Sequence, residues 1–261
     1  MLLKRLLAHP LTRGLNIDDP STTGLRRTII DRKPFLKRIY RDWYERIQNH
    51  LPDCRGPVLE LGSGAGFLTD YVPRLITSEV FECPFVQAVL DGRALPIDAA
   101  SLRAIVMTDV LHHIPDPGQF FEEAVRCLMA GGRVLLVEPW VSGWSRIIYG
   151  HLHHEPFQPD WPDWTIPSVG PLSGANGAMP WILFERDREK FAGRFPKLKI
   201  ERVEPFMPFR YLVSGGISMR TLAPNATYRF WTGIERAMER YMRTWAMFAF
   251  VVISRTEDGQ A

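Results

Sequence analysis

Short apolar runs alternate with polar segments through the middle of the chain, and many of them end at an acidic residue or a glycine. The runs lie at 57–61, 74–80, 86–92, 102–108 and 133–138. Such runs are typical of strands that are buried on both faces of a parallel sheet. Segments at about 67–73 and 117–128 have room for helices between the runs, so the pattern predicts alternating strands and helices.

A helical pattern also precedes the first run. Apolar residues recur at Phe35, Ile39, Trp43 and Ile47. This spacing predicts an amphipathic helix that starts near Asp31 and ends before Pro52. Residues 1–30 contain Pro10 and Pro20, and we expect them to form an irregular or partly helical N-terminal arm.

The remainder of the chain, residues 31–261, is expected to fold as a single α/β domain. Apolar runs at 197–206 and 246–255 fit strands six and seven. The intervening segments 139–196 and 207–245 are too long for simple connections, and they hold seven of the eight tryptophans. We interpret them as a lid built from insertions after strands five and six; an ordinary hydrophobic subdomain is the alternative.

Charge is unevenly distributed along the chain. The net charge of +3 is too small to indicate a nucleic-acid partner. Residues 1–48, however, hold 11 basic and 5 acidic residues, a net charge of +6. This basic face could meet an anionic membrane, or it could simply be a solvated helix surface.

The three cysteines, Cys54, Cys83 and Cys127, are scattered and form no C-x-x-C pair. This pattern favours neither a disulfide framework nor a zinc site, and it is typical of a reducing compartment. Residues 1–10 are too short and interrupted for a signal peptide, and no stretch reaches the length of a membrane span. We therefore expect a cytoplasmic protein, with peripheral membrane contact limited to the N-terminal arm.

The first apolar run ends in a glycine cluster, Gly62-Ser63-Gly64-Ala65-Gly66. Glycines at this place allow a tight turn with positive φ and close approach of a ligand to the backbone. The G-x-G-x-G spacing differs from the G-x-G-x-x-G of dinucleotide folds, and no G-K-[ST] follows as in a P-loop. A ligand is expected against this turn, although such a turn can also serve only to reverse the chain.

Acidic residues follow the other strands. Glu79 lies 17 residues after Gly62, close to the spacing at which an acid meets a ribose hydroxyl. Asp91, Asp109 and Glu138 end the next three runs. Ligands of doubly wound sheets bind at the carboxyl edge of the strands, so these acids should surround a ligand.

The glycine turn with Glu60 and the run Asp109-Val110-Leu111-His112-His113-Ile114-Pro115-Asp116 resemble class I S-adenosylmethionine (SAM) dependent methyltransferases. The second run resembles their type 11 group, which includes enzymes that methylate quinones and other small molecules. The resemblance is strong over 58–138 and only architectural elsewhere. It implies a doubly wound, seven-stranded Rossmann-like sheet with helices on both faces and strand seven antiparallel between strands five and six.

The resemblance also implies the residues that bind SAM. They are Glu60, Gly62, Ser63, Gly64, Gly66, Glu79, Asp91, Gly92, Asp109 and His112. In this interpretation Glu60 holds the amino acid tail, Glu79 the ribose, Asp91 the adenine and Asp109 the methionine portion.

Methyl transfer requires a base when the acceptor must lose a proton, and histidine is the usual choice near neutral pH. His113 and His154 are the candidates, with Glu155 as an orienting partner or substrate contact. Packing or solvent-facing histidines are the alternative. No metal is expected at 151–155, because no third ligand cluster accompanies these residues.

The sequence thus predicts a SAM-dependent methyltransferase that acts on an oxygen or carbon of an apolar small molecule or lipid-like acceptor. A non-catalytic SAM-fold scaffold subunit is the main alternative. A nucleic-acid or protein methyltransferase is less favoured, since Thr108-Asp109-Val110-Leu111 is not the Asn/Asp-Pro-Pro-Tyr type and no basic stripe with aromatics stands out. The glycine spacing disfavours an NAD-dependent enzyme.

Overall fold

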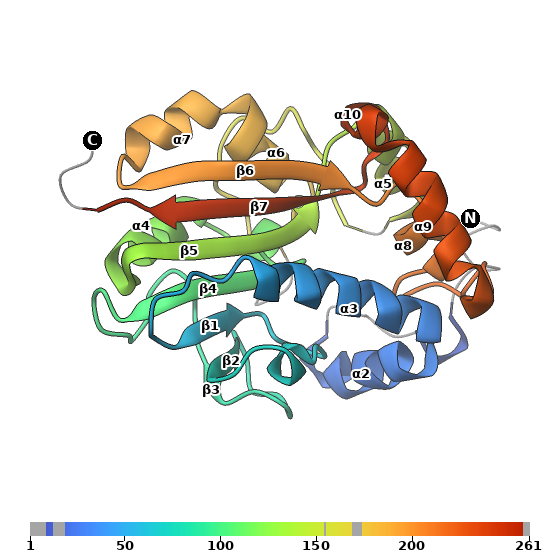
Figure 1. The fold of residues 1–261 in the computed structure, drawn as a ribbon, viewed down its shortest axis with the longest axis horizontal. Coiled ribbons are helices and arrows are strands. Elements are labelled where there is room, and N and C mark those ends of the chain that lie inside the picture. The colour runs from blue at the N-terminus through green and yellow to red at the C-terminus, as the bar shows by residue number, and fades with distance from the viewer. Residues whose placement is uncertain (1–8, 13–18, 154, 169–173, 258–261) are drawn as a thin grey trace.

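A single seven-stranded sheet forms the centre of the molecule in the computed structural model, which describes residues 9–12, 19–153, 155–168 and 174–257. The strands are β1 Val58–Leu61, β2 Leu75–Glu79, β3 Ala88–Val89, β4 Leu102–Thr108, β5 Leu128–Pro139, β6 Leu198–Phe206 and β7 Phe248–Arg255. Their order is β3-β2-β1-β4-β5-β7-β6, with β7 antiparallel to β5 and β6 and the other pairs parallel (Figure 1). The predicted doubly wound, seven-stranded sheet is confirmed.

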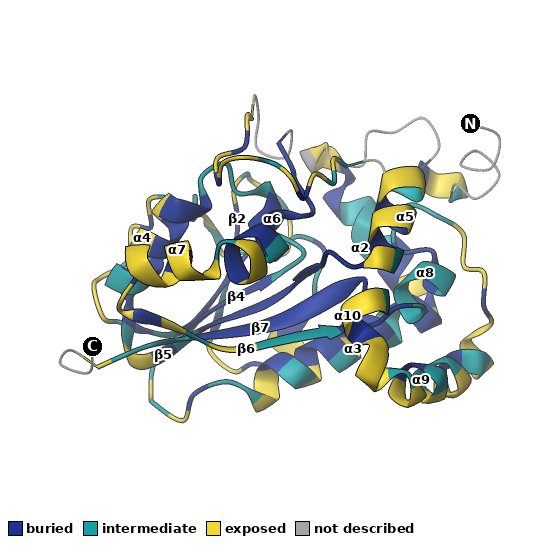
Figure 2. Cartoon of the chain, turned by 90° about the horizontal axis from the view of Figure 1, so that it is seen from above, coloured by how far each residue is buried: buried dark blue, intermediate teal, exposed yellow. Residues whose placement is uncertain are grey.

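Helices cover both faces of this sheet. They are α2 Thr23–Arg32, α3 Pro34–Asn49, α4 Pro117–Cys127, α5 Gly143–Leu152, α6 Met179–Trp181, α7 Arg188–Arg194, α8 Arg210–Ser214, α9 Tyr228–Ala237 and α10 Met242–Trp245. Seen from above, α4, α6 and α7 lie on one side of the strands and α3 and α9 on the other (Figure 2). No helix within the described ranges is both long and apolar enough to cross a membrane.

Alternating side chains of the central strands supply two separate cores. In β4, Ile105 and Met107 belong to one buried cluster and Ala104 and Val106 to the other. This division follows from the two-residue period of a strand, whose successive side chains point to opposite faces. The continuous apolar run at 102–108 therefore serves both faces at once.

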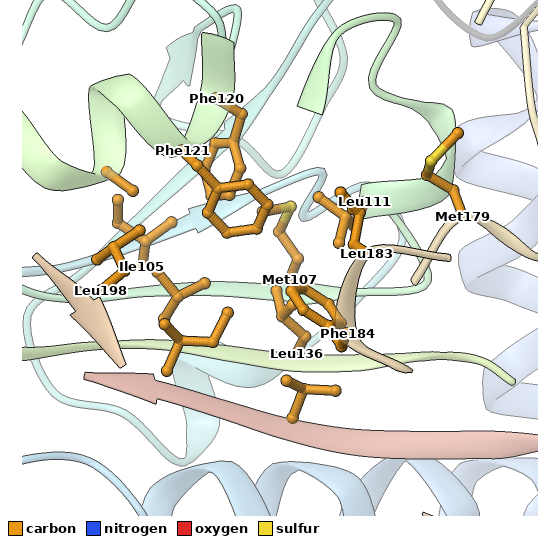
Figure 3. Packing of buried hydrophobic residues seen from close by; sticks show 14 of the residues in the cluster. Ile105, Met107, Leu111, Phe120, Phe121, Leu136, Met179, Leu183, Phe184 and Leu198 are labelled. Carbon is orange, nitrogen blue, oxygen red and sulfur yellow. The ribbon is translucent and has the colours of Figure 1, made fainter. Parts of the chain in front are cut away.

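The first core contains much of the insertion after β5. Met179, Leu183 and Phe184 pack against the same cluster as Phe121 of α4 and Leu198 of β6 (Figure 3). Leu183, Phe184 and Phe121 are fully buried. The second half of this insertion is thus a structural layer on the sheet as well as a connection.

The second core rests on α3. Its apolar residues Phe35, Ile39, Trp43 and Ile47 are buried, as their spacing predicts. Trp43 packs at 5.2 Å from Phe248 of β7 (ring centroids), which ties the helix to the antiparallel strand. The helix spans Pro34–Asn49, and Pro34 at its start suits a first turn that needs no amide donor.

Several local predictions were wrong. The helix expected at 67–73 is only a 3-10 turn, Leu68–Asp70, since Pro73 follows after too few residues for a longer helix. The third strand shrinks to Ala88–Val89 at the sheet edge, where only β2 holds it. Strand β5 starts at Leu128, directly after α4 and five residues before the expected run at 133–138.

Gly131 explains this last difference. It has a φ of +74°, as expected for glycine, but it lies within β5. The pairing of β5 with β4 shifts register at the adjacent step between Leu102 and Ala104. The glycine thus serves an irregularity of the strand pair, for which positive φ is typical.

Much of the N-terminal arm lies outside the described residues, including Lys4, Arg5 and Arg13. Its described part forms 3-10 turns at Pro10–Thr12 and Pro20–Thr22 and then helix α2. The membrane contact expected of this arm stays a prediction.

Candidate functional site

A cavity of about 590 Å³ opens at the carboxyl ends of β1, β2 and β4. Helices α2 and α3 supply part of its wall through Arg26, Ile30, Tyr40 and Tyr44. The cavity is lined by Glu60, Gly62, Ser63, Gly64, Gly66, Glu79, Asp91, Gly92 and Asp109. The structure therefore brings together all the predicted cofactor residues except His112, at the edge where such sheets bind ligands.

The glycine turn has the backbone that only glycine adopts easily. Gly62 and Gly64 have φ values of +67° and +43°. A Cβ on Gly62 would lie 2.4 Å from a methyl carbon of Val110, so no side chain fits there. Gly66 is packed as closely, since a Cβ would lie 2.6 Å from the Tyr44 hydroxyl. These contacts keep the floor of the cavity free of side chains.

Ser63 fixes the turn to strand β2. Its backbone N–H donates to the Ser78 carbonyl at 2.8 Å, and its hydroxyl accepts from the Ser78 N–H at 3.1 Å. Ser78 in turn donates its hydroxyl to the Glu60 carbonyl at 2.8 Å. The turn is thus held in shape by internal hydrogen bonds.

Buried carboxyl groups surround one end of the cavity. Burial raises the pKa of Glu60 to about 7, and the nearby charge of Glu79 adds to this shift. Burial also raises the pKa of Glu79, although the Val80 N–H donates to its carboxylate at 3.0 Å. The pKa of Asp109 is raised to about 7, again mainly by burial. A cationic ligand would favour the ionised form of these groups.

Asp91 differs from these acids. Arg93 pairs with its carboxylate at 2.7 Å and also bonds it through Nε and the backbone N–H. These hydrogen bonds from Arg93 lower the pKa of Asp91. Asp91 lines the cavity as predicted, but it is half-exposed and already has a partner on the chain.

Helix α3 contributes two tyrosines that the sequence argument missed. Tyr40 and Tyr44 line the cavity, and the Tyr44 hydroxyl accepts the Phe67 N–H at 3.3 Å. They stand four residues apart, next to the apolar stripe that identified the helix. That spacing was the available signal, but it does not show which edge of the sheet the helix reaches.

His112 is buried behind the cavity wall. It is only 1% exposed, and its Nδ1 lies 2.7 Å from Glu138, which is fully buried. Glu138 also accepts the N–H groups of Val110 and Leu111. Burial alone would lower the pKa of His112, but the hydrogen bond to Glu138 and the nearby carboxylate of Glu155 raise it well above its ordinary value.

His113 does line the cavity, and Glu155 lies beside it. The Nε2 of His113 is 3.5 Å from Glu155, and its Nδ1 is 3.4 Å from the Gly174 carbonyl. Burial lowers the pKa of His113 to about 4. The sequence argument paired Glu155 with His154, whereas the structure places Glu155 beside His113. The role of either histidine as the base stays a prediction. His154 lies outside the described residues.

The tryptophans of the two insertions pack elsewhere. Trp140 and Trp164 are buried in the first core, and Trp144 lies 5.4 Å from Trp245 (ring centroids). None of the described residues that line the cavity is a tryptophan. Among the described residues the insertions reach the cavity through Ile166, Ser168 and Ile217, and the lid expected of them stays a prediction.

Comparison with known proteins agrees with this geometry. Residues 59–136 match a family model described as a methyltransferase domain. The fold is similar to geranyl diphosphate C-methyltransferase from Streptomyces coelicolor A3(2), with 16% identity, coverage of 96% of this chain and 89% of that chain, and a TM-score of 0.49. A SAM-dependent methyltransferase from Mesorhizobium loti shows 15% identity, coverage of 80% and 95%, and a TM-score of 0.47. No curated protein sequence matches the chain.

The matched segment, which holds the glycine turn and the loop after β4, is a methyltransferase domain. SAM is the cofactor that we expect at this site, as the resemblance of the glycine turn and the run 109–116 to the type 11 methyltransferases implies. The cavity fits SAM, because SAM combines cationic sulfonium and ammonium centres with an adenosine. Glu60, Glu79 and Asp109 supply carboxyl groups whose ionised form a cation would stabilise, and the bare glycine turn gives close access.

Proposed function

We propose that this protein transfers the methyl group of SAM to an oxygen or carbon of an apolar small-molecule acceptor. The observation that carries the acceptor class concerns three of the four isoleucines on the cavity wall, Ile30, Ile166 and Ile217. They come from α2 and from the two insertions, all outside the matched segment 59–136. Apolar walls with a few polar groups are typical of sites for small organic ligands.

The chain's own residues bind and orient the reactants in this proposal. The glycine turn and Glu60 would hold the amino acid end of SAM, and Glu79 the ribose. SAM supplies an activated methyl group: the sulfur–methyl bond breaks as the acceptor–methyl bond forms, and the acceptor releases a proton when it carries one. The main contribution of the cavity is to place the acceptor in line with the sulfonium and to exclude water.

Calorimetry with S-adenosylhomocysteine (SAH), the demethylated product of SAM, tests the cofactor site. We expect wild-type protein to bind SAH and Gly64→Arg to lose at least about 100-fold in affinity. A Cβ at Gly64 already lies 3.3 Å from Glu79, and an arginine would fill the cavity and pair with that acid. Gly150→Arg is the matched control, because Gly150 is exposed on α5 with open space around it.

Turnover with methyl-labelled SAM tests the acceptor class. Hydroxylated aromatic and prenyl compounds should take up label in the wild type and not in Gly64→Arg, whereas sugars and peptides should not. Transfer only to polar acceptors would contradict the proposal. SAH binding with no transfer to any acceptor would favour the scaffold alternative.

A further inference from the structure

A largely buried cluster of nitrogen and oxygen donors lies beside the cavity wall. His112 and His113 come from the loop after β4, and Glu155 comes from the insertion after β5. Their donor atoms all lie within 4.8 Å of one another. The sequence argument dismissed a metal at 151–155 for lack of further ligands, and the fold supplies them from 112–113.

The distances within the cluster are long for charge-assisted hydrogen bonds. His112 Nε2 is 3.3 Å and His113 Nε2 is 3.5 Å from the Glu155 carboxylate. Charge-assisted N–H···O bonds are about 2.7–2.9 Å, which is the distance between His112 and Glu138 on the other side of the same ring. Two donors bound at about 2.0–2.2 Å to one tetrahedral ion lie about 3.4 Å apart. The Glu155 contacts match that separation.

Glu138 provides the outer partner that metal-bound histidines usually have. It takes the Nδ1 side of His112 at 2.7 Å and leaves Nε2 directed to Glu155. It is itself held by the N–H groups of Val110 and Leu111. A carboxylate in this place fixes the tautomer and the orientation of the imidazole for a metal on Nε2. Glu138 and Glu155 also offset the charge of a divalent ion.

We propose that His112, His113 and Glu155 bind one divalent first-row transition metal ion through Nε2, Nε2 and carboxylate oxygen. Two imidazoles and one carboxylate suit Zn²⁺ or Fe²⁺ with coordination positions left open. Binding requires the more distant donors to close by up to about 1.4 Å, from a separation of at most 4.8 Å to the about 3.4 Å of a tetrahedral site.

The ion would lie at the wall of the cavity. His113 lines the cavity next to Pro115, close in the chain to Asp109, whereas His112 and Glu155 lie behind it. The open positions can therefore take water or an oxygen of the acceptor. This last consequence rests on the proposed methyl transfer, whereas the metal site itself does not.

Metal titration of the full-length protein tests the site. After dialysis against a chelator, Co²⁺ is added while the visible absorption is followed, and Zn²⁺ binding is measured by calorimetry. We expect one ion per chain and a tetrahedral or five-coordinate Co²⁺ spectrum. Glu155→Gln and His113→Ala should each weaken binding by at least about 100-fold, more than the loss of an outer carboxylate partner costs.

His151→Ala is the matched control. This histidine is exposed on α5, and its Nδ1 is 2.8 Å from the Ile147 carbonyl, so the variant should bind metal like the wild type. Thermal unfolding and SAH titration of each variant show that the fold is intact. Wild-type metal affinity in Glu155→Gln and His113→Ala, or no stoichiometric binding in the wild type, would overturn the site. Metal binding without SAH binding would support the site and contradict the proposed function instead.

Discussion

Two regions of the molecule differ in how their buried charges are stabilised. Around the glycine turn, burial raises the pKa values of Glu60 and Asp109 to about 7. In the insertion after β6, by contrast, Arg210 is held by Glu235 and Asp42, and the Tyr228 hydroxyl lies 2.9 Å from it. The first group has its charges destabilised, and the second has them matched within the chain.

This difference indicates where a ligand completes the structure. Burial destabilises the ionised form of these acids, and a cationic ligand would offset that destabilisation. Carboxyl groups with raised pKa values of this kind often mark functional sites. A buried pair with several hydrogen bonds needs no ligand, and it specifies how segments pack. The insertion after β6 therefore has a mainly structural role, although it sends Ile217 to the cavity.

The largest effect is expected from Glu235→Ala. Glu235 accepts the N–H groups of Phe209 and Arg210 at 3.0 and 2.8 Å and also bonds the Arg210 guanidinium. Its loss leaves a buried arginine with Asp42 as its remaining acidic partner and two amides without their acceptor. We expect the free energy of unfolding to fall by about 3–5 kcal/mol, measured by urea denaturation.

The comparison predicts that this variant keeps its cofactor site. SAH affinity should stay within about threefold of wild type under conditions where the protein is folded. Glu239→Ala, an exposed acid of the following turn, should change stability by less than about 0.5 kcal/mol. A loss of SAH affinity much larger than threefold in Glu235→Ala would show that the Arg210 cluster and the glycine turn are energetically coupled.

A smaller effect is expected from Glu60→Gln. The Glu60 carboxyl has a pKa of about 7 in the native state, above its ordinary value of 4.5. Between these pH values the native state keeps a proton that the unfolded state has released, so stability falls as pH rises through this window. Glutamine removes this term. Unfolding measured from pH 5 to pH 8 should therefore show the variant gaining on wild type, by on the order of 2 kcal/mol above pH 7.

The same substitution should weaken SAH binding by about tenfold, because the ammonium group loses its proposed carboxylate partner. Glu79, whose charge contributes to the raised pKa of Glu60, is still present in this variant. Glu45→Gln, on the exposed side of α3, is the control and should alter neither property. If stability changed with pH in the same way in Glu60→Gln and wild type, the raised pKa of Glu60 would be contradicted.

The strands and the cofactor edge could be predicted from sequence because their signals are local. The run Leu102–Thr108 and the glycines at 62, 64 and 66 have meaning within a few residues of themselves. The carboxyl edge then follows from the rule that parallel strands end together. The sequence alone therefore places Glu60, Glu79 and Asp109 around one ligand.

The parts of the structure that the sequence did not predict depend on contacts between segments that are distant in the chain. Nothing local joins Glu155 to His112, or Arg210 to Asp42 across 168 residues. The tryptophans could be predicted to be buried. The sequence does not show, however, whether a buried aromatic residue lies in a core or over a ligand. Only the packing of the insertion on the sheet shows that Trp164 belongs to the core.

The smallest effect, from Tyr44→Phe, tests how far the turn depends on its support. The Tyr44 hydroxyl accepts the Phe67 N–H at 3.3 Å and packs closely on Gly66. Phenylalanine keeps the ring but leaves that amide without its acceptor, so we expect a loss of about 1 kcal/mol in unfolding free energy. The end of the glycine turn should also loosen, which lowers SAH affinity by about twofold to fivefold.

Tyr71→Phe is the matched control for this variant. Tyr71 belongs to the same aromatic group, with its ring centroid 5.7 Å from that of Tyr44, but it is half-buried. It should therefore leave both stability and SAH affinity near wild type. If Tyr44→Phe lowers stability without any change in SAH affinity, the helix supports the fold but not the ligand contact. The SAH site would then be formed by the strands and the glycine turn without help from α3, that is, by residues within the matched segment 59–136.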